Sequence, residues 1–173
     1  MPITRIFLAP GASGTIERLH PHRDGLDARG LEVELVPLPK GAAERAVPVY
    51  RGAVPADARS SVAIGGHSFG GRVASLIAAE SPPAALVLLS YPLHAPGRQD
   101  AWRDRTSHWP EIRCPVLLLG GEADPFARID LMRTEVEQLS DATLRTWPRL
   151  GHGLGPVLDE ALDAVAAFLR ERT

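Results

Sequence analysis

The chain has 173 residues, of which 45% are hydrophobic and 23% charged, with a formal net charge of −2. This length fits one domain over residues 1–173, and the charge balance argues against a nucleic-acid partner. The sequence shows neither a membrane-spanning apolar run nor a signal peptide, and its single cysteine, Cys114, excludes an internal disulfide, so we expect a cytoplasmic protein with no membrane partner.

The first part of the chain predicts, in order, a strand over 3–9, a small-residue loop over 10–14, a partly helical stretch over 15–29, a strand over 31–38 and one irregular helix within 39–60. Pro21 is expected to interrupt the first helical stretch, since proline disturbs a helix interior. The alternation of polar and apolar residues over 31–38 favours a place near the edge of a sheet.

The remainder predicts buried strands over 61–64, 85–90 and 115–119, a last strand over 142–147, helices over 69–80, 129–139 and 158–169, and a loop-like segment over 91–113. Strand and helix therefore alternate six times. That pattern predicts an α/β fold with three layers, α/β/α, in which helices cover both faces of a six-stranded parallel sheet. Functional residues should follow the carboxyl ends of strands, near the point where strand order reverses.

The stretch Gly66-His67-Ser68-Phe69-Gly70 lies between a predicted strand and a predicted helix. In this context G-x-S-x-G works as a nucleophile elbow, a sharp turn that exposes the serine hydroxyl at the end of a sheet. Glycines stand two residues to either side because side chains there would clash in so tight a turn. An ordinary glycine-rich turn is the competing interpretation, so the rest of the chain must supply a base and an acid.

Asp124 and His152 follow the fifth and sixth predicted strands, which gives the order Ser68, Asp124, His152. A serine hydroxyl needs a base to take its proton, and an acid must orient that base. The sequence therefore predicts a catalytic Ser-His-Asp triad. Alternatively, Asp124 before Pro125 could be only a turn residue, Glu122 could be the acid, and His152 could be a loop histidine without a catalytic role.

An oxyanion hole needs two donors. The backbone N–H of Phe69 is the first candidate, and the loop after the first strand offers Ala12 or, as a weaker choice, Ser13. Tyr91 and His94, together with Ser13, are candidates for the substrate-binding pocket, with surface packing as the equal alternative for Tyr91 and His94.

Three other residues invite a functional interpretation that we consider weaker. His67, at the variable position of the elbow, is interpreted as a packing residue. His20 and His22 flank Pro21 and suggest a metal, but no third ligand has suitable spacing, so a solvated loop is expected there. We expect no metal site.

These motifs resemble the α/β-hydrolase superfamily. The stretch Tyr91-Pro92-Leu93-His94-x-Pro96-Gly97, together with Gly121-Glu122-x-Asp124-Pro125-Phe126, is similar to its small, lidless, dienelactone-hydrolase-like branch of serine hydrolases. The resemblance implies nucleophile Ser68, acid Asp124, base His152, and a minimal six-stranded version of the fold. The sequence departs from the family pattern at Pro10-Gly11, where His-Gly is usual. This difference leaves the second oxyanion donor open between Ala12 and Ser13.

The expected function is hydrolysis of small carboxylic esters or thioesters through an acyl-enzyme, without a cofactor and with a homodimer as a possible assembly. No cap domain fits between residues 91 and 113, so the site should be an open cleft whose shape depends on 39–60 and 91–113. Two alternatives use the same residues: a non-catalytic interaction module that keeps the triad by descent, and an acyltransferase that passes the acyl group to an acceptor other than water.

Overall fold

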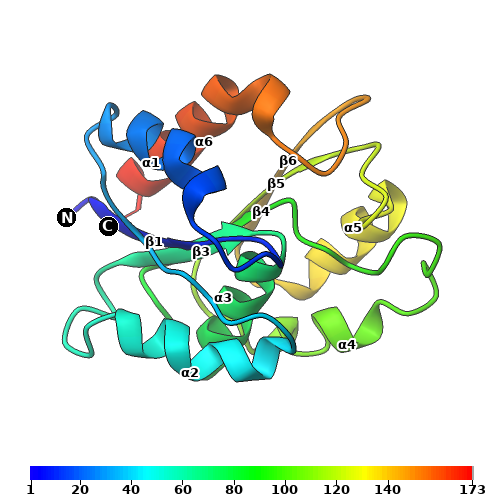
Figure 1. Cartoon of the computed structure of the whole chain (residues 1–173), viewed down its shortest axis with the longest axis horizontal. Helices are drawn as coiled ribbons and strands as arrows, with labels where there is room; N and C mark the ends of the chain where they lie inside the picture. Colours follow the sequence, from blue (N-terminus) through cyan, green and yellow to red (C-terminus); the bar gives the residue numbers. More distant parts are fainter. Residues whose placement is uncertain (173) are drawn as a thin grey trace.

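The computed structural model describes residues 1–172. Six strands form one sheet in the order β2-β1-β3-β4-β5-β6, and each neighbouring pair is parallel. The predicted parallel α/β sheet is therefore confirmed (Figure 1). The strands are β1 (Arg5–Ala9), β2 (Glu32–Leu35), β3 (Ala63–His67), β4 (Ala85–Leu89), β5 (Val116–Gly121) and β6 (Ala142–Trp147).

Helices connect successive strands and cover the sheet. Across residues 1–172, no helix combines the length and the apolar character that crossing a membrane requires. The α-helices are α1 (His20–Asp27), α2 (Ala43–Ala53), α3 (Phe69–Glu80), α4 (Arg103–Thr106), α5 (Ile129–Glu135) and α6 (Leu158–Arg170). Short 3-10 turns are η1 (Glu17–Leu19), η2 (Trp109–Glu111), η3 (Val136–Gln138) and η4 (Gly155–Val157).

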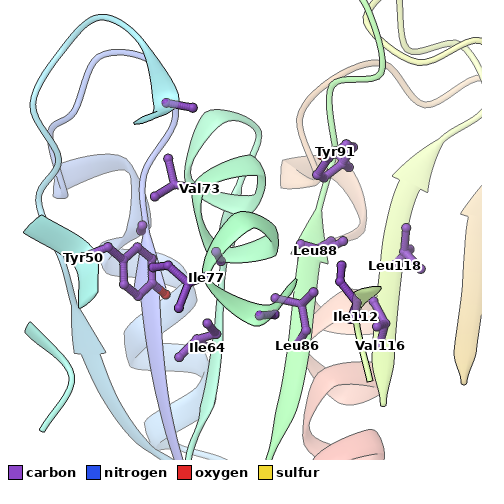
Figure 2. Close-up of a cluster of buried hydrophobic side chains, with 14 of the residues drawn as sticks. Tyr50, Ile64, Val73, Ile77, Leu86, Leu88, Tyr91, Ile112, Val116 and Leu118 are labelled. Atoms are coloured by element: carbon purple, nitrogen blue, oxygen red, sulfur yellow. The ribbon is translucent and has the colours of Figure 1, made fainter. Parts of the chain in front are cut away.

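The sheet divides the hydrophobic core into two layers. Figure 1 shows α1 and α6 together on one face of the sheet and α2 and α3 on the other. Figure 2 shows the α2–α3 side, where Ile64 of β3 lies beneath Ile77 of α3 and Tyr50 of α2, and Val116 of β5 lies beside Ile112 further along the same layer. Burial on both faces explains why β3, β4 and β5 read as continuous apolar runs rather than alternating ones.

The segment around Pro21 differs from its prediction. Pro21 does not interrupt a helix, because it occupies the first turn of α1, where the missing N–H would have no intrahelical partner. The stretch from His20 to His22 is consequently part of a helix rather than a solvated loop. Helix α1 then packs against α6, with Leu26 in the core between helix and sheet.

Residues 39–60 fold into α2 more regularly than their prolines predicted. Ala43, Ala46 and Tyr50 of α2 are buried against the sheet. The Tyr50 hydroxyl lies between β1 and β3, 2.8 Å from the Phe7 carbonyl oxygen and 2.6 Å from that of Gly65, and it accepts the Gly65 N–H at 3.0 Å. Burial raises the pKa of Tyr50, so its hydroxyl stays neutral and joins the two strands just below the predicted elbow.

Residues 91–113 form a packed cover on the α3 side. Trp109 and Ile112 are buried in the core, and the Tyr91 ring meets Trp109 edge to face at 5.0 Å between centroids. Below them Ser75 Oγ lies 2.7 Å from His108 Nε2 and 3.3 Å from the Tyr91 hydroxyl. These contacts attach the segment to α3 and explain why it does not behave as a free loop.

The half-buried position of His108 predicts acid sensitivity. Desolvation, aided by the charge of Arg72, lowers the pKa of His108 to about 4 from its usual 6.5. Because the unfolded chain then binds a proton in a pH range where the folded chain does not, the free energy of unfolding should fall as pH drops below about 6.5. For this histidine alone we expect a loss of about 1–2 kcal/mol between about pH 7.5 and about pH 5.

Urea unfolding of the parent and of His108→Gln at both pH values measures this effect. The variant lacks the titrating group but keeps an amide next to Ser75, so its loss of stability on acidification should be smaller by that amount. Equal pH dependence in the two proteins would contradict the prediction, whatever the variant does to stability at neutral pH.

Candidate functional site

Ser68 occupies a strained turn between β3 and α3. Its backbone angles, φ of 50° and ψ of −115°, lie outside the regions that residues other than glycine ordinarily adopt. Such a conformation costs about 1–3 kcal/mol. The glycines around it are sterically required: a Cβ on Gly66 would lie 2.4 Å from the Gly70 carbonyl carbon, and one on Gly70 would lie 2.3 Å from the Ala9 carbonyl oxygen. The sequence G-x-S-x-G therefore permits a turn in which the helix starts directly over the strand end.

The site lies where strand order reverses. The chain passes from β1 outward to β2 and then returns to the other side of β1 to form β3, so the ends of β1 and β3 are neighbours. The loop after β1 consequently lies against the elbow: a Cβ built on Gly11 would be 3.9 Å from that of Ser68. Phe69 begins α3, and Ala12 and Ser13 lie in the same cleft wall as Gly11.

Ser68, His152 and Asp124 form a continuous hydrogen-bonded chain. His152 Nε2 lies 2.8 Å from Ser68 Oγ, and His152 Nδ1 lies 2.8 Å from Asp124 Oδ2. The Asp124 side chain is almost completely buried, at 1% exposure, whereas that of His152 is 24% exposed. The three residues come from the ends of β3, β5 and β6, so the parallel sheet brings together groups that are up to 84 positions apart in sequence.

The two carboxylates after β5 have different partners. The second oxygen of Asp124, Oδ1, accepts the Phe126 N–H at 2.8 Å, which fixes the rotation of the carboxylate. Glu122 turns away from the histidine, accepting a hydrogen bond from Thr146 at 2.8 Å and pairing with Arg133 at 3.2 Å. Asp124 thus combines the turn role and the contact with His152 that the sequence presented as alternatives.

Two aromatic rings hold His152 in place. Phe126 lies 4.4 Å from the imidazole between centroids, and His67 meets it edge to face at 5.4 Å. His67 Nε2–H donates to the His152 carbonyl oxygen at 3.2 Å. Burial lowers the pKa of His67 to about 4, with His152 acting in the same direction, so His67 is neutral at pH 7. The interpretation of His67 as a packing residue missed this hydrogen bond to His152. The position of His67 next to Ser68 was the signal in the sequence that could have indicated it.

A cleft of about 550 Å³ opens beside Ser68 and His152, within the range of small-molecule sites. Its walls come from the loop after β1, from η1 and α1, and from the segment after β6. Within the described chain, neither 39–60 nor 91–113 contributes to this lining, contrary to expectation, because both segments pack on the α3 side of the sheet. Lining residues that the sequence did not identify are Arg18, Leu19, His22, Leu154 and Leu158.

Tyr91 and His94 do not reach this cleft, contrary to the pocket hypothesis. Tyr91 is 2% exposed and is held by the α3-side network. His94 is 1% exposed; its Nε2 accepts the Arg128 N–H at 3.0 Å and its Nδ1–H donates to the Ala95 carbonyl oxygen at 2.9 Å. Both side chains therefore turn into the core. The segment after β4 packs beneath the turn that contains Asp124, and His94 supports that turn.

Comparison with solved structures finds the same fold in several proteins. A monoacylglycerol lipase of Paleococcus ferrophilus has a TM-score of 0.84 at 16% identity, with 98% of this chain and 95% of that chain covered. Est1E of Butyrivibrio proteoclasticus, bound to ferulic acid, has a TM-score of 0.80 at 16% identity, with coverage of 99% and 90%. The thermophilic esterase Est2 of Thermogutta terrifontis, bound to propionate, has a TM-score of 0.75 at 16% identity, with coverage of 98% and 84%.

A family model described as "Alpha/beta hydrolase domain" matches residues 42–164, which is more than half of the chain. The matched region contains the elbow at Ser68, the Asp124 turn and His152. The resemblance inferred from the motifs is confirmed at this level: the chain belongs to the α/β-hydrolase domain family.

Proposed function

We propose that this protein is a serine hydrolase that cleaves small carboxylic esters or thioesters through a covalent acyl-enzyme. The observation that carries the proposal is the unbroken hydrogen-bonded chain from Ser68 through His152 to Asp124, with 2.8 Å at each step. At its Ser68 end, this series of hydrogen bonds opens into a cleft at the carboxyl edge of a parallel sheet, where α/β enzymes bind their ligands.

The roles follow from the direction of these hydrogen bonds. Buried Asp124 accepts the Nδ1–H of His152, so the Nε2 lone pair faces Ser68 and can accept its hydroxyl proton. Ser68 Oγ then bonds to the ester carbonyl carbon, and His152 gives the proton to the departing alcohol or thiol as the tetrahedral intermediate collapses. Water repeats the sequence on the acyl-enzyme: His152 takes a proton from it, and Ser68 Oγ leaves as the hydroxyl.

Negative charge on the substrate oxygen needs donors during both steps. The Phe69 N–H is the first candidate because it follows the nucleophile at the start of α3. The loop after β1 borders Ser68, and Ala12 is the candidate there for the second donor, with Ser13 as the alternative. The small glycines at 11 and 70 allow this loop and the helix start to approach each other closely.

The structural relatives give independent support for the choice of substrate class. Proteins that share this fold over nearly the whole chain include one described as a monoacylglycerol lipase, one described as a thermophilic esterase and bound to propionate, and Est1E bound to ferulic acid. Two of these descriptions name an ester-cleaving activity, and both bound molecules are carboxylic acids or their anions. A carboxylic ester therefore fits better than other substrates of hydrolases.

A fluorophosphonate probe tests the proposal because it labels only an activated serine. The parent protein should be labelled at Ser68 and should hydrolyse p-nitrophenyl esters of short acyl chains. Ser68→Ala should lose both properties, while Ser107→Ala, which removes an exposed serine far from the cleft, should keep them. A folded parent protein that is neither labelled nor active would overturn the proposal and favour the non-catalytic interaction module.

A further inference from the structure

Charge on the cleft wall is uneven. Among residues 1–172, Arg18 is the single residue with a permanently charged side chain in the cleft lining. The two other titratable rings in the walls, apart from His152, are His22 and His67, and burial lowers the pKa of each. At neutral pH the residues that line the cleft therefore carry one fixed positive charge and no negative charge.

Arg18 is free to bind a ligand. It is exposed at the end of η1, and within the described chain no ion pair involves its guanidinium. The acids that begin α6 beyond Leu158 have other partners: Asp159 pairs with Arg29 at 3.5 Å, and Glu160 with Arg145 at 3.1 Å. Neither of these acids forms an ion pair with the Arg18 guanidinium.

The remaining lining of the cleft is mostly apolar. Leu19 follows Arg18 directly, Pro21 lies one turn further, and Leu154 and Leu158 form the wall after His152. Such a cleft suits a ligand with a short hydrocarbon body and an anionic end. Guanidinium groups match carboxylates particularly well, since their planar donors can bind both oxygens at once.

We propose that this cleft selects esters or thioesters that carry an anionic group, a carboxylate in the first instance, a few bonds from the scissile carbonyl, and that Arg18 binds that group. The inference rests on the hydrolase function proposed above and narrows its substrate class. The anion can belong to the acyl part, as in a half-ester of a dicarboxylic acid, or to the alcohol part. Both sources present the same chemistry to Arg18.

Paired substrates separate charge from size. In one arm, monoethyl esters of dicarboxylic acids with increasing spacer length are compared with the same esters bearing a terminal carboxamide. In the other arm, the carboxylate or carboxamide is on the alcohol. In at least one arm the parent should show a kcat/KM about tenfold higher for the carboxylate than for the carboxamide, as expected for one hydrogen-bonded ion pair in a partly open cleft. Raising the salt concentration should reduce this preference.

Three variants assign the preference to its source. Arg18→Gln should lower the ratio of kcat/KM for carboxylate over carboxamide to about one, and Arg18→Lys should keep part of this preference. Arg45→Gln is the matched control, because it removes the same charge from an exposed arginine on α2, on the other face of the sheet. Equal kcat/KM for carboxylate and carboxamide in both arms, or an unchanged preference in Arg18→Gln, overturns the inference.

Binding gives a readout that does not need turnover. Calorimetric titration of Ser68→Ala with monoethyl glutarate and with its terminal carboxamide should show tighter binding of the carboxylate, and adding Arg18→Gln should remove the difference. If Ser68 is labelled by the fluorophosphonate but the two ligands bind equally, the substrate class is wrong and the hydrolase proposal stands. If Ser68 is not labelled although the carboxylate ligand binds more tightly than the carboxamide, the hydrolase proposal fails and the anion site remains.

Discussion

Ser68→Ala and His152→Ala should each lower kcat by about 10⁴-fold or more, and the double variant should lose almost nothing further. Single substitutions in a serine, histidine and aspartate unit are strongly non-additive because each one alone disables the same proton transfer. Here the two side chains share one hydrogen bond of 2.8 Å, and His152 has no second hydroxyl partner in the described residues that could replace Ser68. Steady-state rates with a short-chain p-nitrophenyl ester give the three values.

The double variant is the decisive measurement. If Ser68 and His152 act independently, their losses multiply, and the double variant falls far below either single one. Such a result would contradict a shared mechanism even if both single variants were impaired. Ser107→Ala serves again as the control for protein quality, and unfolding curves of each variant show whether a loss of rate reflects a loss of folded protein.

The sequence predicted the framework of the site because the framework depends on local patterns. Short apolar runs identified β3 and β5, and a last strand was predicted over 142–147. The parallel arrangement then placed the ends of these strands at one edge. Ser68, Asp124 and His152 could therefore be grouped without knowing a single side-chain contact. The glycines at 66 and 70 were predictable from the elbow pattern, but the sequence alone did not show that the end of β1 at Ala9 also excludes a side chain at both positions.

The walls of the cleft could not be predicted in this way, because they depend on where connecting segments pack. Nothing in the sequence around Leu19 or His22 distinguishes a helix that borders the active edge from one that covers the sheet further away. Leu158 was predicted only as the start of an amphipathic helix, and the packing of α6 against α1 brings it into the same cleft lining as Arg18. The same limit explains the error at Tyr91 and His94, which follow a strand end but turn into the core.

The second large effect is expected at Asp124, where replacement by asparagine exchanges one oxygen for an NH₂ group and keeps the shape. The Phe126 N–H donates to Oδ1 of Asp124 at 2.8 Å, and that bond requires an acceptor. The introduced amide should therefore place its oxygen toward Phe126 and its NH₂ group toward His152 Nδ1. His152 must then accept at Nδ1 and carry its proton on Nε2, so it can no longer take the proton of Ser68.

Asp124→Asn should consequently lower kcat by about 10⁴-fold while the folded structure survives, because the histidine is held in the wrong tautomer. The substitution separates the two interpretations of Asp124. A residue that only caps the turn at Pro125 would work equally well as asparagine, since the bond to Phe126 is preserved, and activity would then be unchanged. Glu122→Gln is the matched control: it removes a neighbouring carboxylate that contacts Thr146 and Arg133 rather than His152, and its rate should stay close to that of the parent.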